Sequence, residues 1–286
     1  MACGHQFRSG GKLSADRIWN EYQSSKQTVA EIAASHGISE STVKRRLRSV
    51  RLEWVQPPLD GGGCVHLDVT YWGRNWGVML AVDDATGRVL YMGFVSHETV
   101  GDYRDAIESI ESRGYRIDGI VIDGMRSLFR EFSAYKVQMC QFHMCQIVRR
   151  YLTRKPRMLA SRELLSLIGG LTRADRDGFT EAYRCWKEKW DVFVNRRSVS
   201  KRTGRSHYTH RRLKTTVNSI DFYLPYLFTF RECAGMPNTN NKIEGIFTDL
   251  KKNLNNHSGM SEENRKRFII GFFKAWDAPH CERATP

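Results

Sequence analysis

The fold is decided by the stretch Cys64-Val-His-Leu-Asp68-Val-Thr-Tyr-Trp72, which is followed by two more β-rich runs, Trp76-Gly-Val-Met-Leu-Ala-Val-Asp83 and Arg88-Val-Leu-Tyr-Met-Gly-Phe-Val95. β-branched and aromatic residues are frequent in all three runs, as is typical of strands. The connections are short, and Asp84-Ala-Thr-Gly87 is typical of a tight turn. The pattern therefore predicts a meander of three consecutive antiparallel strands.

The residues that follow alternate between helical and strand patterns. Helical spacing covers 100–113, 126–132 and 142–152, and apolar strand patterns cover 117–123 and 136–140. Three antiparallel strands followed by alternating crossovers give an α/β domain with a mixed five-stranded sheet and helices on its faces.

The strand pattern disappears between residues 153 and 235, which we expect to be an all-helical insertion. Segments 164–171, 173–194 and 211–227 have helical spacing, and the basic stretch 195–207 between two of them is expected to be mobile.

The α/β domain is expected to occupy 64–152 and to resume at 236–276, after the insertion. Its second part opens with a cluster of helix-capping residues at 238–244. A linker at 57–63, rich in Pro and Gly, separates the α/β domain from the residues before it.

Residues 13–56 are expected to form a small all-α domain of the helix-turn-helix type. Thr28 begins a capping-box pattern, Gly37 supplies the turn and Ser39 caps a second helix. An ordinary helical hairpin with a solvated basic face is the alternative. As a DNA-binding module, the second helix would meet the major groove and its flanking phosphates with Ser41, Thr42, Lys44, Arg45 and Arg48.

Composition and charge exclude several classes of protein. The chain has 286 residues, 41% of them hydrophobic and 27% charged, which is typical of globular proteins and unlike disordered or collagenous ones. The difference of 45 basic and 31 acidic residues gives 45 − 31 = +14, which favours nucleic acid as a partner. Seven scattered cysteines are not a disulfide framework. Without a leader or a membrane span, we expect a soluble, cytoplasmic protein.

Three acids are candidates for catalysis because of their places in the pattern. Asp68 lies in an apolar strand run, where a carboxylate is costly unless it is paired or bound to a cation. Asp123 ends a second such run, and Glu244 lies in the first turns of the helix after the insertion. If the two strands are neighbours, the three carboxylates meet near the centre of the sheet. Such an oxygen-only set suits two Mg²⁺ (or Mn²⁺) ions about 3.5–4 Å apart, the arrangement used in phosphodiester displacement.

Each of these residues also has an ordinary structural explanation. An Asp at a strand end often stabilises a turn, and a Glu in a first helical turn often complements the helix dipole. For Cys140, His143 and Cys145 the alternatives are a partial zinc site and core residues. The core is favoured, because a Cys-x₂-His without a second ligand pair does not close a tetrahedral site.

Taken together, the motifs resemble a known family. Leu67-Asp68-Val-Thr-Tyr-Trp72, Val121-Ile-Asp123-Gly124, Cys140-Gln-Phe-His143 and Asn240-Asn-Lys-Ile-Glu244 are similar to motifs of the DDE transposases of bacterial insertion sequences, in particular the IS256/MULE-like group and its IS1249-like branch. The resemblance covers about residues 60 to 275. It implies an RNase H-like fold with a helical insertion before the catalytic Glu. It also implies catalysis and metal ligation by Asp68, Asp123 and Glu244, and a role near that site for Cys140 and His143.

Residues 1–12 resemble a remnant of a zinc ribbon. Cys3-Gly-His-Gln-Phe-Arg looks like the end of such a ribbon, whose first cysteine pair is missing. A four-thiolate site cannot close with these residues, so we do not expect structural zinc in this chain.

The sequence therefore predicts a DNA transposase that binds the terminal inverted repeats of an insertion sequence and carries out Mg²⁺- or Mn²⁺-dependent strand cleavage and strand transfer into target DNA. We expect it to act on double-stranded DNA as a homodimer or larger assembly, with no membrane partner. A catalytically inactive or truncated DNA-binding remnant and an RNase H-like junction nuclease are the alternatives.

Two further groups of residues invite a DNA-binding interpretation. The aromatic residues Tyr71, Trp72 and Trp76 lie beside Asp68 in the sequence, although core packing is the more usual role of such residues. A charge run is most often just a solvated loop. Phosphate contacts are nevertheless expected from the basic residues of the insertion, namely Arg196, Arg197, Lys201, Arg202 and Arg205.

Overall fold

The computed structural model describes residues 13–24, 27–73, 75–257 and 259–283. The chain forms two compact units, one of residues 56–244 and one that combines residues 1–55 with 245–286. The expected ribbon remnant at 1–12 lies outside the described residues. No helix in the described ranges is both long and apolar enough to cross a membrane.

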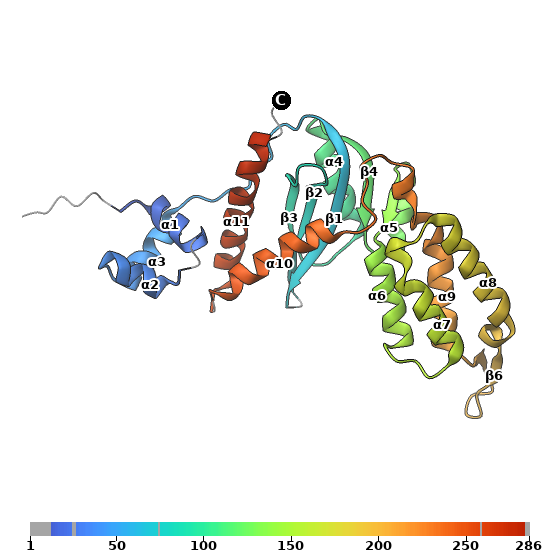
Figure 1. Cartoon of the computed structure of the whole chain (residues 1–286). Helices are drawn as coiled ribbons and strands as arrows, with labels where there is room; N and C mark the ends of the chain where they lie inside the picture. Colours follow the sequence, from blue (N-terminus) through green and yellow to red (C-terminus); the bar gives the residue numbers. More distant parts are fainter. Residues whose placement is uncertain (1–12, 25–26, 74, 258, 284–286) are drawn as a thin grey trace, which may run out of the picture. The chain divides into compact units, whose positions relative to one another are not determined.

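A five-stranded sheet is the centre of the larger unit (Figure 1). Its strand order is β3-β2-β1-β4-β5. β1 is antiparallel to β2 and parallel to β4, so the sheet is mixed, as predicted. This architecture is consistent with the RNase H-like fold that the resemblance implies. The strands are β1 (Gly62–Trp72), β2 (Trp76–Asp83), β3 (Val89–Val95), β4 (Arg116–Ile122) and β5 (Val137–Met139).

One face of the sheet is closed by α4 (Val100–Ser112), with α5 (Arg126–Glu131) beside it. Thr99 begins α4 with a capping box, in which its side chain accepts a hydrogen bond from the backbone of Asp102 and the Asp102 side chain accepts one in return. Tyr103 and Ile107 of α4 belong to one buried cluster with the alternate residues Val65 and Leu67 of β1. The apolar alternation along β1 therefore fixes which of its residues point away from this core.

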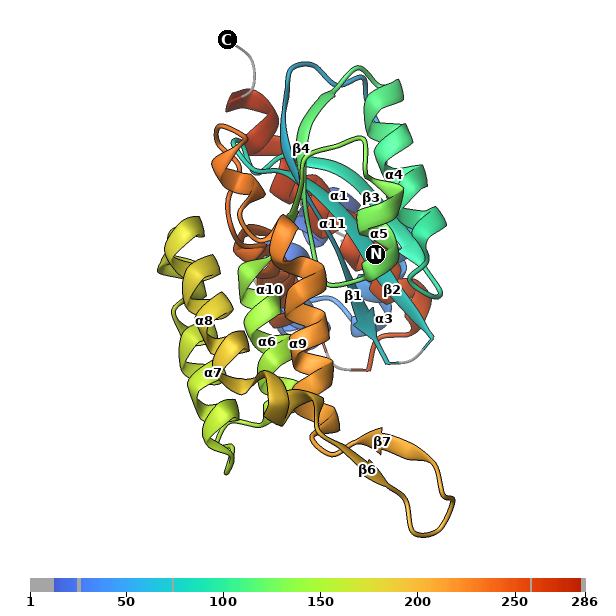
Figure 2. The ribbon, with the colours of Figure 1, turned by 90° about the vertical axis from the view of Figure 1, so that its right-hand side faces the viewer.

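The insertion is a bundle of helices placed side by side (Figure 2). It contains α7 (Leu159–Gly169), α8 (Arg176–Asn195) and α9 (Arg211–Tyr223), and α6 (Gln141–Leu152), the last helix before the insertion, lies beside them. Trp186 of α8 donates a hydrogen bond to the carbonyl oxygen of Ala160 in α7 at 3.1 Å, which ties the two helices together. The helical insertion agrees with the prediction.

The expectation that the insertion contains no strand is wrong. Residues 195–207 belong largely to a hairpin of β6 (Arg197–Val199) and β7 (Ser206–Tyr208), which extends from the helices in Figure 2. Gly204, with φ 65°, forms the turn, and the Arg197 guanidinium lies 4.7 Å from the centre of the Tyr208 ring. A run of Arg, Lys, Ser and Thr has no apolar alternation, so the pattern could not reveal strands held by backbone bonds and this cation–π contact.

The smaller unit contains the first three helices, α1 (Ala15–Ser24), α2 (Val29–His36) and α3 (Glu40–Ser49). Thr28 and Glu31 form the predicted capping box, Gly37 has the left-handed conformation at φ 60°, and Ser39 caps α3. The predicted local elements are therefore present, and Val43 and Leu47 of α3 are buried.

The end of the chain also belongs to the smaller unit. This differs from the expectation that residues 236–276 complete the α/β domain. The last helix, α11 (Glu262–Arg283), belongs here, and α10 (Asn241–Asn255) begins in the larger unit and continues into this one. Arg267 donates to the carbonyl oxygens of Leu47 and Val50 at the end of α3, at 2.9 and 2.7 Å. These bonds satisfy carbonyl groups that a helix end leaves without partners, which explains why α11 docks on the N-terminal helices.

Substitution of Gly114, between α4 and β4, tests how closely this turn packs against Leu59. Gly114 has φ +103°, and a Cβ atom there would lie 2.7 Å from the carbonyl oxygen of Leu59. We expect Gly114→Ala to cost roughly 1–3 kcal/mol, and to lower Tm by about 2–4 °C for each kcal/mol. Gly169→Ala is the control, because no atom lies within 4 Å of a Cβ there. Equal Tm values for the two variants in thermal unfolding would contradict this packing.

Candidate active site

The register of β1 and β4 brings Asp68 and Asp123 to the same level. The two strands are parallel neighbours, as expected, and His66 pairs with Val121. Asp68 lies two residues further along β1, which continues to Trp72, and Asp123 follows directly after the last residue of β4. Because neighbouring strands are about 4.8 Å apart, this register places the two residues side by side.

Both aspartates lie on the face of the sheet opposite the core under α4. Val65 and Leu67 belong to that core, and side chains alternate along a strand, so His66 and Asp68 point the other way. The start of α10 lies on this second face, where Asn240 contacts the His66 ring. The helix that carries Glu244 therefore begins beside the two aspartates.

A cavity of about 530 Å³ opens over the carboxyl end of β1. Asp68 and Asp123 line it together with a third acid, Glu98, which accepts a hydrogen bond from the Tyr103 hydroxyl at 2.6 Å. The remaining lining residues come mainly from the turn after β4 and from α6, and are Val69, Tyr71, Gly124, Met125, His143, Gln146, Ile147 and Arg150.

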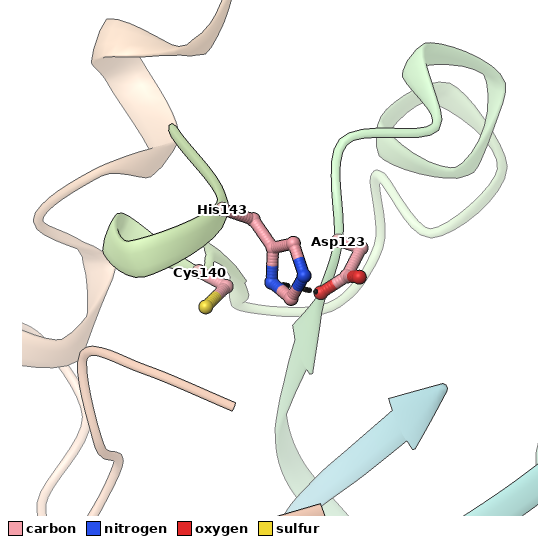
Figure 3. A group of neighbouring side chains, drawn as sticks. All are labelled: Asp123, Cys140 and His143. Atoms are coloured by element: carbon pink, nitrogen blue, oxygen red, sulfur yellow. Dashed lines mark ion pairs between the residues drawn. The ribbon is translucent and has the colours of Figure 1, made fainter. Parts of the chain in front are cut away.

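His143 lies between two of the predicted carboxylates. Its Nδ1 atom is 2.8 Å from Oδ1 of Asp123 and 3.5 Å from Oε1 of Glu244. Figure 3 shows the His143 ring, on α6, directed at Asp123 at the end of β4. The three side chains are each roughly 30% exposed, which leaves them accessible from the solvent. Asp123 and Glu244 are thus joined through an imidazole.

The charges of these groups influence one another strongly. Burial raises the pKa of Asp68 well above its usual range, and the neighbouring charge of Asp123 raises it further. Burial alone would lower the pKa of His143, but its contacts with Asp123 and Cys140 raise that pKa to about 11. A protonated His143 supplies one positive charge among the acids.

Cys140, His143 and Cys145 lie in different surroundings. Cys140 precedes α6 and is fully buried, and its Sγ accepts a hydrogen bond from the backbone N–H of Asn240 at 3.2 Å. Cys145 packs in the core and donates to the carbonyl oxygen of Ile168. His143 alone of the three lines the cavity. Cys145 is therefore part of the core, whereas the buried Cys140 sulfur also lies within 4.8 Å of ligand atoms of Asp123 and His143.

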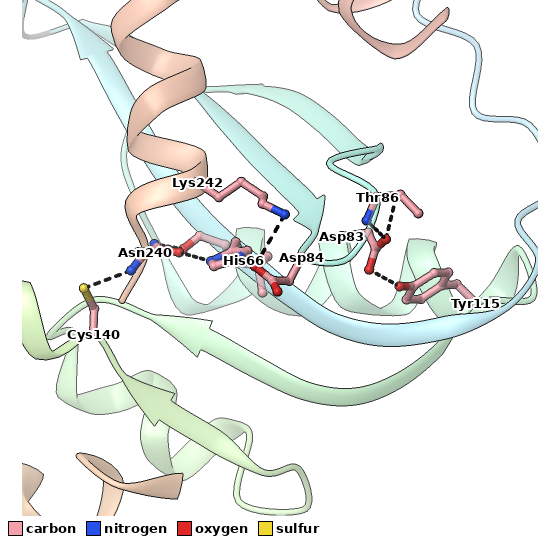
Figure 4. Close-up of polar contacts among 9 residues, drawn as sticks. His66, Asp83, Asp84, Thr86, Tyr115, Cys140, Asn240 and Lys242 are labelled. Atoms are coloured by element: carbon pink, nitrogen blue, oxygen red, sulfur yellow. Dashed lines mark hydrogen bonds and ion pairs between the residues drawn. The ribbon is translucent and has the colours of Figure 1, made fainter. Parts of the chain in front are cut away.

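A buried polar network connects the end of the insertion to the sheet (Figure 4). Asn240 contacts Nδ1 of His66 through its side-chain oxygen at 2.6 Å, and its amide nitrogen donates to the carbonyl oxygen of Leu67. The other ring nitrogen of His66 lies 2.8 Å from Oδ1 of Asp84, and Lys242 lies 3.6 Å from the same oxygen. These contacts hold the first turn of α10, and with it Glu244, against β1.

The donor set fits a divalent cation. Burial raises the pKa of Asp68, the neighbouring charge of Asp123 raises it further, and a cation bound beside both carboxylates would favour their ionised forms. Asp68 and Asp123 offer the oxygen ligands that Mg²⁺ and Mn²⁺ prefer, and Glu244 could complete the set. Within the described ranges, Asp123, Cys140 and His143 are the one group of three such side chains whose ligand atoms all lie within 4.8 Å of one another. The predicted set of Asp68, Asp123 and Glu244 is not such a group.

The other predicted residues take different positions. Tyr71 lines the cavity, whereas Trp76 is buried and stacks on Trp72 at a ring distance of 5.2 Å. The five predicted residues of α3 remain on its surface, where Thr42 is partly buried and the others are exposed. The basic residues predicted to bind phosphate are exposed on the β6–β7 hairpin and at its base, namely Arg196, Arg197, Lys201, Arg202 and Arg205.

Sequence reasoning missed several residues that shape the site. Glu98 follows β3 and directly precedes Thr99, the N-cap of α4, and this position was the signal available. His66 and Asp84 are separated from Asn240 by more than a hundred residues, and no periodicity reveals such a contact. Alternation did place His66 on the face of Asp68, which could have marked it as a buried polar residue near the site.

No protein-family model matches the sequence, and the search of curated proteins found no match either. Among solved structures, this chain is similar to a chain of the simian T-cell lymphotropic virus intasome in complex with the PP2A regulatory subunit B56 gamma, at 11% identity and a TM-score of 0.24. The similarity covers 66% of this chain and 69% of that chain. At this distance no function can be transferred, so function has to be argued from the residues of the site.

Removing the Asp68 charge tests the electrostatics of the site. Since the pKa of Asp68 is raised in the folded protein, its ionised form destabilises the fold as pH rises above the ordinary Asp value of about 4. In EDTA at pH 7.5, Asp68→Asn should therefore raise Tm by a few degrees, and this gain should shrink toward pH 4.

A divalent cation should make the wild type more stable than Asp68→Asn, which reverses the order of their Tm values in EDTA. Mg²⁺ or Mn²⁺ should raise the Tm of the wild type and leave that of Asp68→Asn nearly unchanged, because ligand binding stabilises the folded state. Asp105→Asn, at an exposed position on α4, is the control. If Asp68→Asn is less stable than the wild type in EDTA, the ionised Asp68 carboxylate does not destabilise the fold.

Proposed function

We propose that this chain is a DNA transposase of the DDE type, which binds the ends of an insertion sequence and catalyses divalent-metal-dependent strand cleavage and strand transfer. One observation carries the proposal: Asp68 and Asp123 lie level on adjacent parallel strands, and Glu244 is held to Asp123 through His143. The family resemblance of the motifs supports the same assignment of catalytic residues.

The chemistry follows from the donor set. Divalent ions bound by Asp68, Asp123 and Glu244 would stabilise the attacking and leaving oxygens of a phosphodiester displacement. The contribution of the protein is positioning. Asn240 and His66 fix the start of α10, and the backbone N–H of Val69 donates to Oδ1 of Asp68 at 2.8 Å, which holds that carboxylate at the strand end.

His143 has two tasks in this proposal. Its charge compensates Asp123 and Glu244 before a metal binds, and its ring orients the Asp123 carboxylate by their 2.8 Å contact. Cys140 stabilises the start of the same helix through its hydrogen bond from Asn240. These contacts support a role for the Cys-x₂-His motif in organising the site.

DNA recognition is assigned to α3. Its start is polar and capped by Ser39, its inner face is apolar, and Arg45 and Arg48 are exposed on its outer face. Such a helix can place its side chains in a major groove while its basic residues contact the flanking phosphates. The basic β6–β7 hairpin supplies a second phosphate-binding surface on the insertion. Because two ends are processed together, we expect a homodimer or larger assembly on double-stranded DNA.

Cleavage of a donor plasmid tests the catalytic assignment. The protein is incubated with Mg²⁺ or Mn²⁺ and a plasmid that carries its own coding segment with native flanks, and new DNA ends are mapped. Asp123→Asn and Glu244→Gln should each lower cleavage by at least about 100-fold, because each removes a ligand from the catalytic set. Both should still bind the ends, and Asp105→Asn should cleave like the wild type.

The result also separates the competing functions. Wild-type cleavage at branched DNA junctions instead of the repeat ends would indicate a junction nuclease. A wild type that binds the ends and leaves them intact, in both metals, would indicate a DNA-binding remnant and refute the proposed catalysis.

Substitution of Arg45 tests recognition by α3. Arg45→Ala should weaken binding to the terminal repeats by about 10-fold, since an arginine contact to a base or phosphate is worth roughly 1–3 kcal/mol. Arg17→Ala is the matched control, because Arg17 is exposed on α1 and pairs with Glu21 at 3.2 Å. Fluorescence anisotropy with labelled repeat DNA gives both affinities. Equal affinities for the two variants would remove α3 from the recognition surface.

A further inference from the structure

One face of α6 is directed into the catalytic cavity. His143, Gln146, Ile147 and Arg150 line it, at the i, i+3, i+4 and i+7 positions of the helix. The opposite face packs into the core through Met144, Cys145, Val148 and Leu152. The core packing therefore fixes the rotation of α6 and aims Arg150 at the same cavity as His143.

Arg150 lines the cavity without an acidic partner of its own. In the described part of the chain it has no ion pair, and its guanidinium carbon lies 5.7 Å from the centre of the Tyr151 ring. Arg126, on α5, instead donates a hydrogen bond to the Ser219 hydroxyl, and its guanidinium carbon lies 4.7 Å from the centre of the Phe222 ring. Arg150 thus presents an available cation at a cavity that three acids also line.

A DNA strand entering this cavity brings further negative charge. Asp68, Glu98 and Asp123 line the cavity, and every phosphate adjacent to the cleaved bond is repelled by them. The metal ions of the proposed function would neutralise the scissile phosphate, but not the phosphates beside it. A guanidinium at the cavity can hold one of these through two parallel hydrogen bonds.

We propose that Arg150 is a phosphate-binding residue of the catalytic cavity, which holds the backbone of the reacting strand next to the bond being cleaved. This inference rests on the proposed function of the site. Seven residues separate Arg150 from His143, which is about 10.5 Å along α6 at 1.5 Å per residue. Since a strand rises about 3.4 Å per nucleotide, the bound phosphate lies within about three nucleotides of the scissile one.

The first test compares Arg150→Gln, Arg150→Lys and Arg149→Gln. Arg149 is the matched control, because it is exposed on the same helix and does not line the cavity. Arg150→Gln should lower cleavage of the repeat ends by about 10- to 100-fold, with Tm unchanged. Arg150→Lys should recover part of the loss, and Arg149→Gln should cleave like the wild type.

The second test locates the phosphate. Repeat-end duplexes are prepared with a single neutral methylphosphonate at each position within four nucleotides of the cleaved bond. At one position the modification should slow the wild type by the same 10- to 100-fold and should not slow Arg150→Gln further. That non-additivity identifies a direct contact. Arg150→Gln should also reduce the slope of log binding constant against log salt by about 0.7–0.9.

Two outcomes would overturn the proposal. One is cleavage by Arg150→Gln at the wild-type rate, and the other is full additivity of the variant with every methylphosphonate. A lower Tm of Arg150→Gln together with no recovery in Arg150→Lys would assign the residue a structural role instead. Failure of the proposed function has a separate signature, since the unmodified wild type would then not cleave the repeat ends at all.

Discussion

The placement of Asp68 and Asp123 side by side, at the same level of two adjacent strands, is the constraint on which the geometry of the site depends. Parallel pairing of β1 and β4 brings the carboxylates together, and burial raises the pKa of Asp68. His143, with its pKa raised to about 11, supplies compensating positive charge from α6. A structure selected for stability alone would place apolar residues here. The repulsion is explained if the site binds a divalent cation, because affinity for the cation and instability without it have the same cause.

The site also explains why distant parts of the chain must fold together. Asp68 and Asp123 come from the sheet, His143 from the helix before the insertion and Glu244 from the helix after it. Asn240 ties these parts to one another, since it contacts the His66 ring, the Leu67 carbonyl and the Cys140 sulfur. Asn240 is fully buried, and each lost partner would leave a polar group without a hydrogen bond. The geometry of Glu244 therefore depends on contacts that span most of the larger unit.

Much of this arrangement could be predicted from the sequence, and the reasons for the rest are physical. The succession of strands and helices followed from β-rich runs and helical spacing, and the proximity of Asp68 and Asp123 was predicted on the condition that their strands are neighbours. The capping box of Thr28 and the turn at Gly37 could be read locally, because such motifs depend on a few adjacent residues. The β6–β7 hairpin was missed because its strands have no apolar face. The contact of His66 with Asn240 was missed because it joins residues 174 positions apart, and no local pattern reports on such a pair.

The most direct test of the central claim is the location of Mn²⁺ in crystals of the protein with a DNA end, by anomalous diffraction. Manganese resembles magnesium in its preference for carboxylate oxygens and can be located by its own scattering. We expect a Mn²⁺ peak bound by oxygens of both Asp68 and Asp123, with His143 moved away from Asp123. A peak bound by Cys140 and His143 without Asp68, or no peak at these residues at saturating Mn²⁺, would contradict a carboxylate-bound catalytic metal in this chain.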